Sequence, residues 1–207
     1  MSTLTDMQLR FWAERGYLIV KAAFSPADIS GLRDLTEAGL ASAEARRRFR
    51  SLLDGVLQSV VRDLAGEDVV TLDVARDGPA SRPFNCDTWR APGAGNQAIS
   101  LLVALTDIAG ETAPLFFPGS HRFASASSRS KDRTSDEMVR LATWLADDGQ
   151  KAVGLTCAAG DIWVRHPALF HGSMSGSVDP WLGLEARCMT KAGLAQHPAT
   201  ADIFGSA

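Results

Sequence analysis

The sequence predicts an α+β protein whose β-structure is an antiparallel sandwich or a jelly roll. Apolar residues recur with helical spacing in the first third of the chain, up to Gly66, and many short apolar runs separated by Gly and Pro follow. Helices followed by a series of strands favour antiparallel pairing, because a parallel sheet needs a helix between its strands. At 207 residues the chain has the length of one domain. We expect a mainly helical part at 1–66, a jelly-roll core at 67–191 and a C-terminal tail at 192–207.

Composition and charge exclude several classes of function. Apolar residues make up 45% of the chain and charged residues 22%, as is ordinary for a soluble globular protein. The formal net charge of −3 argues against nucleic acid as the main partner, since phosphate binding needs a basic surface. No apolar run has the length of a membrane span, and the first residues resemble no secretory signal. Cys86, Cys157 and Cys188 are too widely spaced for a CxxC zinc site, so we expect a cytoplasmic protein.

The helical part carries clear start and stop signals. Thr5 and Gln8 form a capping-box pattern ahead of an apolar run, and Gly16 is placed to end that helix. A short β run follows at 17–20. Ser25 and Pro26 are residue types typical of an N-cap and of the first position of a helix, so a second helix is predicted to start there. Apolar residues continue with helical spacing to Leu40. A second apolar stripe at 52–64 predicts another helix that ends at Gly66.

After Gly66 the pattern becomes one of strands and turns. The loop at 93–98 fits GxGxxA superficially, but a dinucleotide fingerprint needs a helix after it, and here a β run follows. One further helix is predicted at 135–149. Loops are predicted at 77–83 and 91–96, and strands at 69–74, 84–89, 99–105, 115–117, 153–157, 162–164 and 182–189.

Asn85 and Asp87 form the first informative polar pair. Side chains two positions apart on a strand point to the same face, so both could reach one site, whereas Cys86 points to the opposite face as a small core residue. Open iron(II) sites in proteins use two histidines and one carboxylate, and Asp87 could be that carboxylate. Asn and Asp are also the residues typical of turns, which is the simpler interpretation of this pair. His171, directly after an apolar stretch, is the second candidate.

Three stretches resemble one protein family. The first stretch comprises residues 11–20 and 24–28. The second comprises residues 103–108 and 113–122 and ends in Pro-Gly-Ser-His-Arg. The third is residues 159–173, which begin with Ala-Gly-Asp and end with His-Gly-Ser. In this order and spacing they resemble the phytanoyl-CoA dioxygenase family of iron(II)- and 2-oxoglutarate-dependent oxygenases. The resemblance implies a double-stranded β-helix (a jelly roll, cupin-like) with N-terminal helices packed outside it. It also implies iron(II) and 2-oxoglutarate as cofactors and places Asp87 and His171 at the metal.

The chain departs from the family at two functional positions. Asn85 stands where the family has the first iron histidine, and a neutral amide oxygen is a weaker iron ligand than imidazole. Trp181 or Leu182 stands where the family has the arginine that holds 2-oxoglutarate. The nearest arginine, Arg187, lies on the same strand face but about 20 Å further along. Losing a bidentate arginine–carboxylate contact lowers cosubstrate affinity about tenfold to a hundredfold. We therefore expect weak iron binding and altered cosubstrate use.

Three functions remain open from the sequence. The first is an enzyme with non-oxidative or 2-oxoglutarate-independent chemistry on a small, largely apolar metabolite, with Asp87 and His171 as an acid/base pair. Its pocket would be lined by Trp89, Trp163 and Trp181.

The second function is a conventional hydroxylase in which Asn85 joins Asp87 and His171 at the iron. Arg187 or Arg90 would then anchor 2-oxoglutarate. The third is a catalytically silent homologue, either a ligand-binding protein or a subunit that pairs with an active one. A homo-oligomer is also open.

Overall fold

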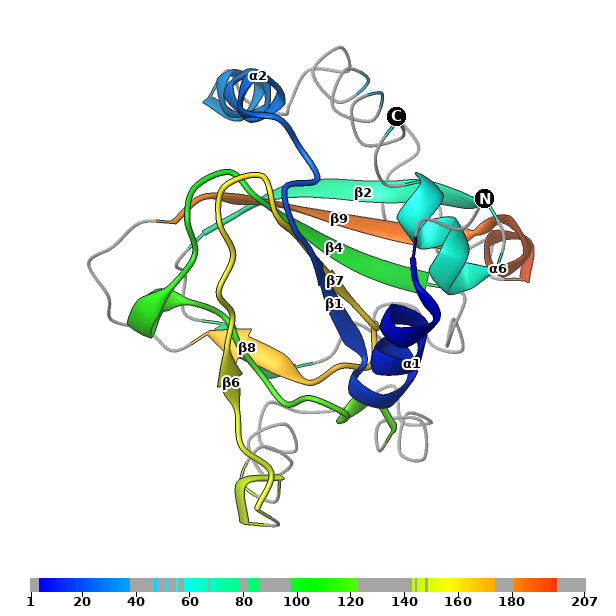
Figure 1. Ribbon diagram of the computed structural model, residues 1–207, viewed down its shortest axis with the longest axis vertical. Helices are drawn as coiled ribbons and strands as arrows, with labels where there is room; N and C mark the ends of the chain where they lie inside the picture. Colours follow the sequence, from blue (N-terminus) through cyan, green and yellow to red (C-terminus); the bar gives the residue numbers. More distant parts are fainter. Residues whose placement is uncertain are drawn as a thin grey trace.

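Two antiparallel sheets and a set of helices make up the structure (Figure 1). It is a computed structural model. The residues it describes are 4–37, 47, 51, 55, 58–66, 68–78, 82–85, 98–122, 143, 145–147, 149–173 and 181–196. The helices are α1 (Asp6–Arg15), α2 (Pro26–Glu37) and α6 (Lys191–Gln196), with a 3-10 turn at Gly110–Thr112; residues 58–65 are also helical. The strands are β1 (Tyr17–Val20), β2 (Val69–Asp77), β3 (Arg82–Asn85), β4 (Ala98–Ala104), β5 (Leu115–Phe116), β6 (Val153–Gly154), β7 (Ile162–Arg165), β8 (His171–Ser173) and β9 (Gly183–Thr190). This confirms the predicted combination of helices with antiparallel strands.

Successive strands alternate between the two sheets. The larger sheet has the order β1-β7-β4-β9-β2 and the smaller one the order β3-β8-β5-β6. From β2 onward the chain therefore crosses from one sheet to the other at nearly every connection, and every strand pair is antiparallel. In Figure 1 the larger sheet runs across the molecule, and β6 and β8 lie below it.

The larger sheet is buried on both faces, and this decides where the polar residues of its strands lie. On one face Leu101 and Val103 of β4 belong to a cluster with Ile29 and Leu32 of α2. On the other face Leu102 belongs to a second cluster, which includes Phe116 of the smaller sheet. Alternation along β4 explains the division, since neighbouring side chains point to opposite faces. We call the space that this second cluster fills the interior.

The first two helices begin where the sequence predicts. The side-chain oxygen of Thr5 accepts from the backbone N–H of Gln8, and the Gln8 side chain accepts from the backbone N–H of Thr5. This capping box satisfies N–H groups that have no partner within the helix. Gly16 ends α1 with φ of 75°, a conformation that glycine adopts without strain. At α2, Ser25 and Asp28 exchange the same reciprocal bonds.

Asp161 links the turn before β7 to the segment that follows β1. Its buried carboxylate accepts from Lys21 Nζ at 2.7 Å and from the backbone N–H groups of Ala22 at 2.9 Å and Ala158 at 2.8 Å. Burial raises the pKa of Asp161, but these hydrogen bonds outweigh it and hold the pKa below its ordinary value. Beside it, Gly160 has φ of 92°, and a Cβ there would lie 2.8 Å from the Phe24 carbonyl oxygen.

Several predicted elements differ from those observed. The loop predicted at 77–83 is shorter, because β2 extends to Asp77 and β3 begins at Arg82. Pro83 is tolerated there because β3 is an edge strand. The predicted tail contains α6, and the strands β5, β6 and β8 are only two or three residues long. The predicted loop at 91–96 and most of the helix at 135–149 lie outside the described residues. No described helix is long and apolar enough to span a membrane.

We predict that Gly16→Ala destabilises the protein strongly. A Cβ at Gly16 would lie 2.3 Å from His121 Nδ1, and the positive φ adds backbone strain. The free energy of unfolding should fall by about 2 kcal/mol or more, measured by urea denaturation. Gly31→Ala is the matched control, since nothing lies within 4 Å of a Cβ there. That change should raise stability by about 0.5–1 kcal/mol, because Gly31 lies within a helix. Equal effects at the two glycines would contradict this account.

Candidate functional site

His171 begins β8 and is positioned from both sides of its strand. Its backbone pairs with Asn85 of β3 and with Phe116 of β5. Its ring Nδ1 lies 2.9 Å from the carbonyl oxygen of Leu169. A carbonyl only accepts, so Nδ1 carries the proton, and in the neutral ring the lone pair lies on Nε2. His171 therefore presents Nε2 as a proton acceptor or a metal ligand.

The Pro-Gly-Ser-His turn holds the segment that leads into His171. Ser120 Oγ accepts from the backbone N–H of Phe170 at 2.8 Å, and the Phe117 N–H donates to the Phe170 carbonyl at 3.0 Å. The turn is itself tied to the end of α1, because the Gly119 N–H donates to the Arg15 carbonyl at 2.8 Å. The conspicuous polar motif at 118–121 thus acts here as a support for His171.

The structure describes only part of the predicted site. Register places the backbone of Asn85 directly opposite His171. Asp87, Trp89 and Arg90 lie outside the described residues, so their roles remain predictions. In the described ranges, no three His, Cys, Asp or Glu side chains are grouped closely enough to hold a metal ion.

Trp163 connects His171 to a buried charge. The rings of Trp163 and His171 meet edge to face, with centroids 6.0 Å apart. The guanidinium carbon of Arg165 lies 5.0 Å from the centroid of the Trp163 ring, within range of a cation–π contact. Trp163 itself belongs to the interior cluster, and its buried Nε1 meets no acceptor among the described residues.

Arg165, Glu185 and Arg187 form a charged cluster in the interior, which we call the Arg–Glu–Arg cluster. Arg165 Nη2 contacts Glu185 Oε1, and Arg187 Nη2 lies 3.6 Å from Glu185 Oε2. The side chains of Arg165 and Glu185 are only 2% and 5% exposed. A buried charge is tolerated only when opposite charge and hydrogen bonds compensate its lost hydration, and Glu185 supplies part of that compensation for both guanidinium groups.

Strand register explains why these residues meet. Ser100 of β4 pairs with Arg165 of β7 on one side and with Arg187 of β9 on the other, and Arg187 in turn pairs with Asp73 of β2. Paired residues point to the same face of a sheet. Glu185 pairs with Leu102, which belongs to the interior cluster, so the row faces the interior.

Trp181, which is predicted together with Leu182 to stand at the family's arginine position, is buried. It is 4% exposed and belongs to the interior cluster with Leu102, Phe116 and Trp163. Its indole Nε1 donates to the Thr112 carbonyl oxygen at 2.9 Å. A large apolar ring whose one polar atom is already paired offers nothing to a carboxylate.

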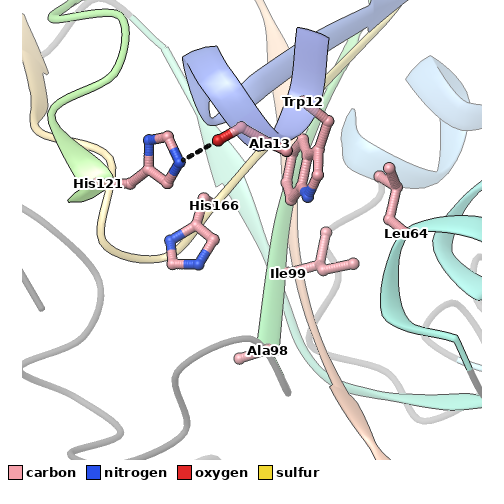
Figure 2. A pocket seen from close by; sticks show the side chains of 7 residues that line it. All are labelled: Trp12, Ala13, Leu64, Ala98, Ile99, His121 and His166. Carbon is pink, nitrogen blue, oxygen red and sulfur yellow. Dashed lines mark hydrogen bonds between the residues drawn. The ribbon is translucent and has the colours of Figure 1, made fainter. Parts of the chain in front are cut away.

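A separate pocket lies at the rim of the larger sheet, between α1 and the start of β4 (Figure 2). Its volume is about 390 Å³, and its lining combines apolar side chains with two imidazoles: Trp12, Ala13, Leu64, Ala98, Ile99, His121 and His166. We call it the rim pocket. His121 Nε2 donates to the Ala13 carbonyl at 3.1 Å, and His166 Nδ1 accepts from the Ala168 N–H at 3.1 Å.

Both imidazoles of the rim pocket are neutral at pH 7. Burial, reinforced by the neighbouring His121, lowers the pKa of His166 to about 4. The pKa of His121 is also lowered, mainly by burial. The hydrogen bond to Ala13 raises this pKa and the charge of Arg122 lowers it, but burial has the largest effect. The two rings lie with centroids 5.0 Å apart, so protonating either one would disfavour the other.

Comparison with protein families matches residues 43–176 to phytanoyl-CoA dioxygenase (PhyH). The match covers more than half of the chain. The chain belongs to the phytanoyl-CoA dioxygenase family. No curated protein sequence matches it.

Solved structures resemble this member of the phytanoyl-CoA dioxygenase family over most of its length. The non-heme alpha-ketoglutarate-dependent carbocyclase SnoK from nogalamycin biosynthesis is 19% identical, with a TM-score of 0.75, covering 91% of this chain and 85% of its own. EctD from S. alaskensis, solved with 2-oxoglutarate and 5-hydroxyectoine, is 16% identical, with a TM-score of 0.71 over 92% and 77%. HygX from Streptomyces hygroscopicus, solved with nickel and 2-oxoglutarate, is 18% identical, with a TM-score of 0.66 over 91% and 88%. At such identities the likeness concerns the fold.

The residues that the structure describes supply one of the iron ligands that the resemblance predicts, His171, through its Nε2. The backbone of Asn85 lies opposite it in strand register. For 2-oxoglutarate, neither Trp181 nor Leu182, the two candidates for the family's arginine position, is cationic. The interior guanidinium groups of Arg165 and Arg187 already contact Glu185, so the predicted anchor Arg187 lies in a charged cluster.

Sequence reasoning missed Arg165, Glu185 and His166. The signal was present: Arg165 ends the apolar run 162–164, and Glu185 lies between Leu184 and Ala186. Charged residues that alternate with apolar ones indicate a solvent-facing side of a strand, which is the wrong interpretation when a second sheet covers that side.

We predict that His166 makes the protein acid-sensitive. Its folded pKa of about 4 lies below the ordinary value of 6.5, so between these values the unfolded chain binds a proton that the folded chain does not. The free energy of unfolding therefore falls as pH drops through this window. Between about pH 7 and about pH 4.5 the wild type should lose about 2–3 kcal/mol more than His166→Asn, in urea denaturation.

The asparagine keeps an acceptor oxygen for the Ala168 N–H, so this variant tests titration rather than a lost hydrogen bond. Carboxylates titrate equally in both proteins and cancel in the comparison. An identical loss of stability in the two proteins would show that His166 does not titrate as its burial implies.

Proposed function

We propose that the two sheets form a double-stranded β-helix whose interior binds a small, largely apolar metabolite and acts on it without 2-oxoglutarate. The strand order supports the fold, since successive strands cross between a larger and a smaller antiparallel sheet, as in a jelly roll. Membership of the phytanoyl-CoA dioxygenase family supports an enzyme of this scaffold. Chemistry must be argued from the site, because one fold serves many reactions.

The observation that carries the proposal is the burial of Trp181, one of the two residues predicted to stand at the family's arginine position. Its ring packs with Phe116 and Trp163, and its Nε1 is bonded to Thr112. Binding a carboxylate there would leave a charge against an apolar ring, which is strongly unfavourable. An apolar ligand, in contrast, is stabilised by contact with Trp163 and Trp181.

One polar contact on the ligand follows from Trp163. Buried N–H groups in proteins nearly always have an acceptor, and Trp163 Nε1 has none among the described residues. A carbonyl or hydroxyl oxygen on the bound molecule would accept from it. Because Trp163 also contacts the ring of His171, that oxygen would lie close to the imidazole.

The acid/base chemistry of the proposal centres on His171. Leu169 holds the proton of Nδ1, which leaves Nε2 to accept a proton from the substrate and return it. Since Leu169 already orients the ring, we assign Asp87 the role of a second acid or base. The proposed reaction is a proton transfer at a carbon or oxygen next to the acceptor group of the ligand.

Iron content and 2-oxoglutarate turnover test the proposal against a conventional hydroxylase. After anaerobic reconstitution with iron(II) and desalting, we expect substoichiometric iron by mass spectrometry and no conversion of 2-oxoglutarate to succinate. Asn85→His should raise the iron content measurably, since imidazole is a favoured iron ligand. Stoichiometric iron and steady succinate release by the wild type would contradict the proposal.

His171→Ala tests catalysis against a silent scaffold. The metal-free protein is incubated with a small-molecule extract in chelator, and products that form are followed by mass spectrometry. Any product that the wild type forms should appear about 10²–10⁴ times more slowly with His171→Ala. Leu101→Val, a conservative change in the cluster on the opposite face of the larger sheet, is the control and should keep the wild-type rate. Turnover that survives the loss of His171, or no turnover at all, would remove the catalytic assignment.

A further inference from the structure

One peptide group of the chain lies between Ser120 and His171 and is hydrogen-bonded at both ends. It is the peptide that joins Leu169 to Phe170. Its N–H, which belongs to Phe170, donates to Ser120 Oγ at 2.8 Å. Its carbonyl, which belongs to Leu169, accepts from His171 Nδ1 at 2.9 Å. The two bonds therefore connect a buried hydroxyl in the turn after β5 with the imidazole at the start of β8.

The planarity of this peptide makes its two hydrogen bonds depend on each other. The peptide is trans, so its N–H and its C=O lie in one plane and point in opposite directions. Fixing the direction of the Phe170 N–H thus also fixes the direction of the Leu169 carbonyl. A hydrogen bond to the N–H in addition polarises the peptide, which makes the carbonyl a better acceptor.

Ser120 is itself held in a rigid frame. Its backbone N–H donates to the Phe117 carbonyl at 3.1 Å, and the residue is only 4% exposed. The Phe117 N–H donates in turn to the Phe170 carbonyl at 3.0 Å, so the same turn also contacts the peptide that follows. On the other side, the Leu169 N–H donates to the His166 carbonyl at 2.8 Å and closes a tight turn. The hydroxyl of Ser120 therefore has a fixed position from which to orient the Leu169 carbonyl.

We propose that Ser120 is a positioning residue that sets the tautomer of His171 through this peptide, with the proton on Nδ1 and the lone pair on Nε2. A neutral imidazole can carry its proton on either nitrogen, and the hydrogen bond made by one nitrogen decides what the other presents. In this chain the deciding group is a main-chain carbonyl whose direction is set by a hydroxyl fifty residues away from Phe170 in the sequence. The inference deepens the proposed function, and it rests on that function only for the use to which Nε2 is put.

Two simpler interpretations of Ser120 lead to different expectations. If its hydroxyl only satisfies a buried N–H, its loss lowers stability and leaves the imidazole of His171 unchanged. If the other contacts of His171 position the ring, among them its contact with the ring of Trp163, the imidazole also stays unchanged. Only a positioning role predicts that the loss of the hydroxyl changes where the proton of His171 lies.

Nitrogen-15 NMR of labelled histidine in Ser120→Ala is the experiment. Spectra are recorded in chelator at about pH 8.5, above the ordinary pKa of histidine, and the His171 signals are assigned by comparison with His171→Gln. The wild type should show the Nδ1–H tautomer, with a proton that exchanges slowly with water. In Ser120→Ala the ratio of the Nδ1–H to the Nε2–H tautomer should fall about fivefold, and the proton should exchange about fivefold faster, as expected when one hydrogen bond is lost.

Two control variants separate this effect from a general loss of stability. Thr190→Val removes another buried hydroxyl, which accepts from the backbone N–H of Gly193 at 3.0 Å at the start of α6. It should lower the melting temperature and leave the His171 signals as in the wild type. Ser120→Thr keeps the acceptor oxygen and adds a methyl group at a buried position. It should also lose stability, by overpacking, and yet retain the Nδ1–H tautomer.

Ser120→Cys replaces Ser120→Ala if the alanine variant does not fold. A thiol is a weaker acceptor than a hydroxyl, so the tautomer ratio should then fall by less than fivefold but measurably, about twofold. The proposal is overturned if the loss of the hydroxyl leaves the tautomer ratio and the exchange rate as in the wild type. It is also overturned if Thr190→Val changes them as much, or if Ser120→Thr changes them in proportion to its lost stability. None of these signals depends on iron content or turnover, so failure of this proposal and failure of the proposed function are distinguishable.

Discussion

The interior of this protein contains two guanidinium groups, those of Arg165 and Arg187, and the carboxylate of Glu185 that contacts both of them. The opposite charges compensate each other, and the rest of the interior packs around them. Arg165 and Glu185 are almost fully buried, so each stabilises the charge of the other. The pair also links β7 to β9 across β4. Removing one partner would leave an uncompensated charge, which typically costs about 3–5 kcal/mol. The cluster therefore constrains which ligands the interior can accept.

The chain retains the supports of the family fold and changes the groups that face the interior. The Pro-Gly-Ser-His turn still holds the backbone that leads to His171, through Ser120 and Phe170. These bonds satisfy buried backbone groups whatever the reaction, so any chemistry on this scaffold needs them. Trp181 and Glu185, in contrast, belong to the interior. Trp181 presents an apolar ring whose Nε1 is already bonded to Thr112, and Glu185 contacts the guanidinium groups of Arg165 and Arg187.

Local signals in the sequence predicted the fold better than they predicted the site. The capping box at Thr5 and the Gly16 terminus act within a few residues, so they can be recognised without knowing the rest of the structure. Resemblance to the family added His171, whose backbone the strand register places opposite position 85. The strand β8 is only three residues long, which is too short for an alternating pattern to identify it in the sequence.

The Arg–Glu–Arg cluster could not be predicted in the same way. Whether Glu185 faces water or the interior depends on the second sheet covering that face, a long-range fact that no local pattern contains. The rim pocket has the same origin, since His121 and His166 come together only when the turn after β5 and the end of β7 both pack against α1. Residues whose role depends on partners distant in the chain are those that sequence reasoning missed.

A crystal structure of the wild-type protein, soaked anaerobically with iron(II) and 2-oxoglutarate, tests the central claim most directly. The account predicts the Glu185 carboxylate on Arg165 and Arg187, Trp181 in its buried position, and no 2-oxoglutarate density in the interior. Density for the far carboxylate of 2-oxoglutarate on either arginine, with Glu185 turned away, would contradict it.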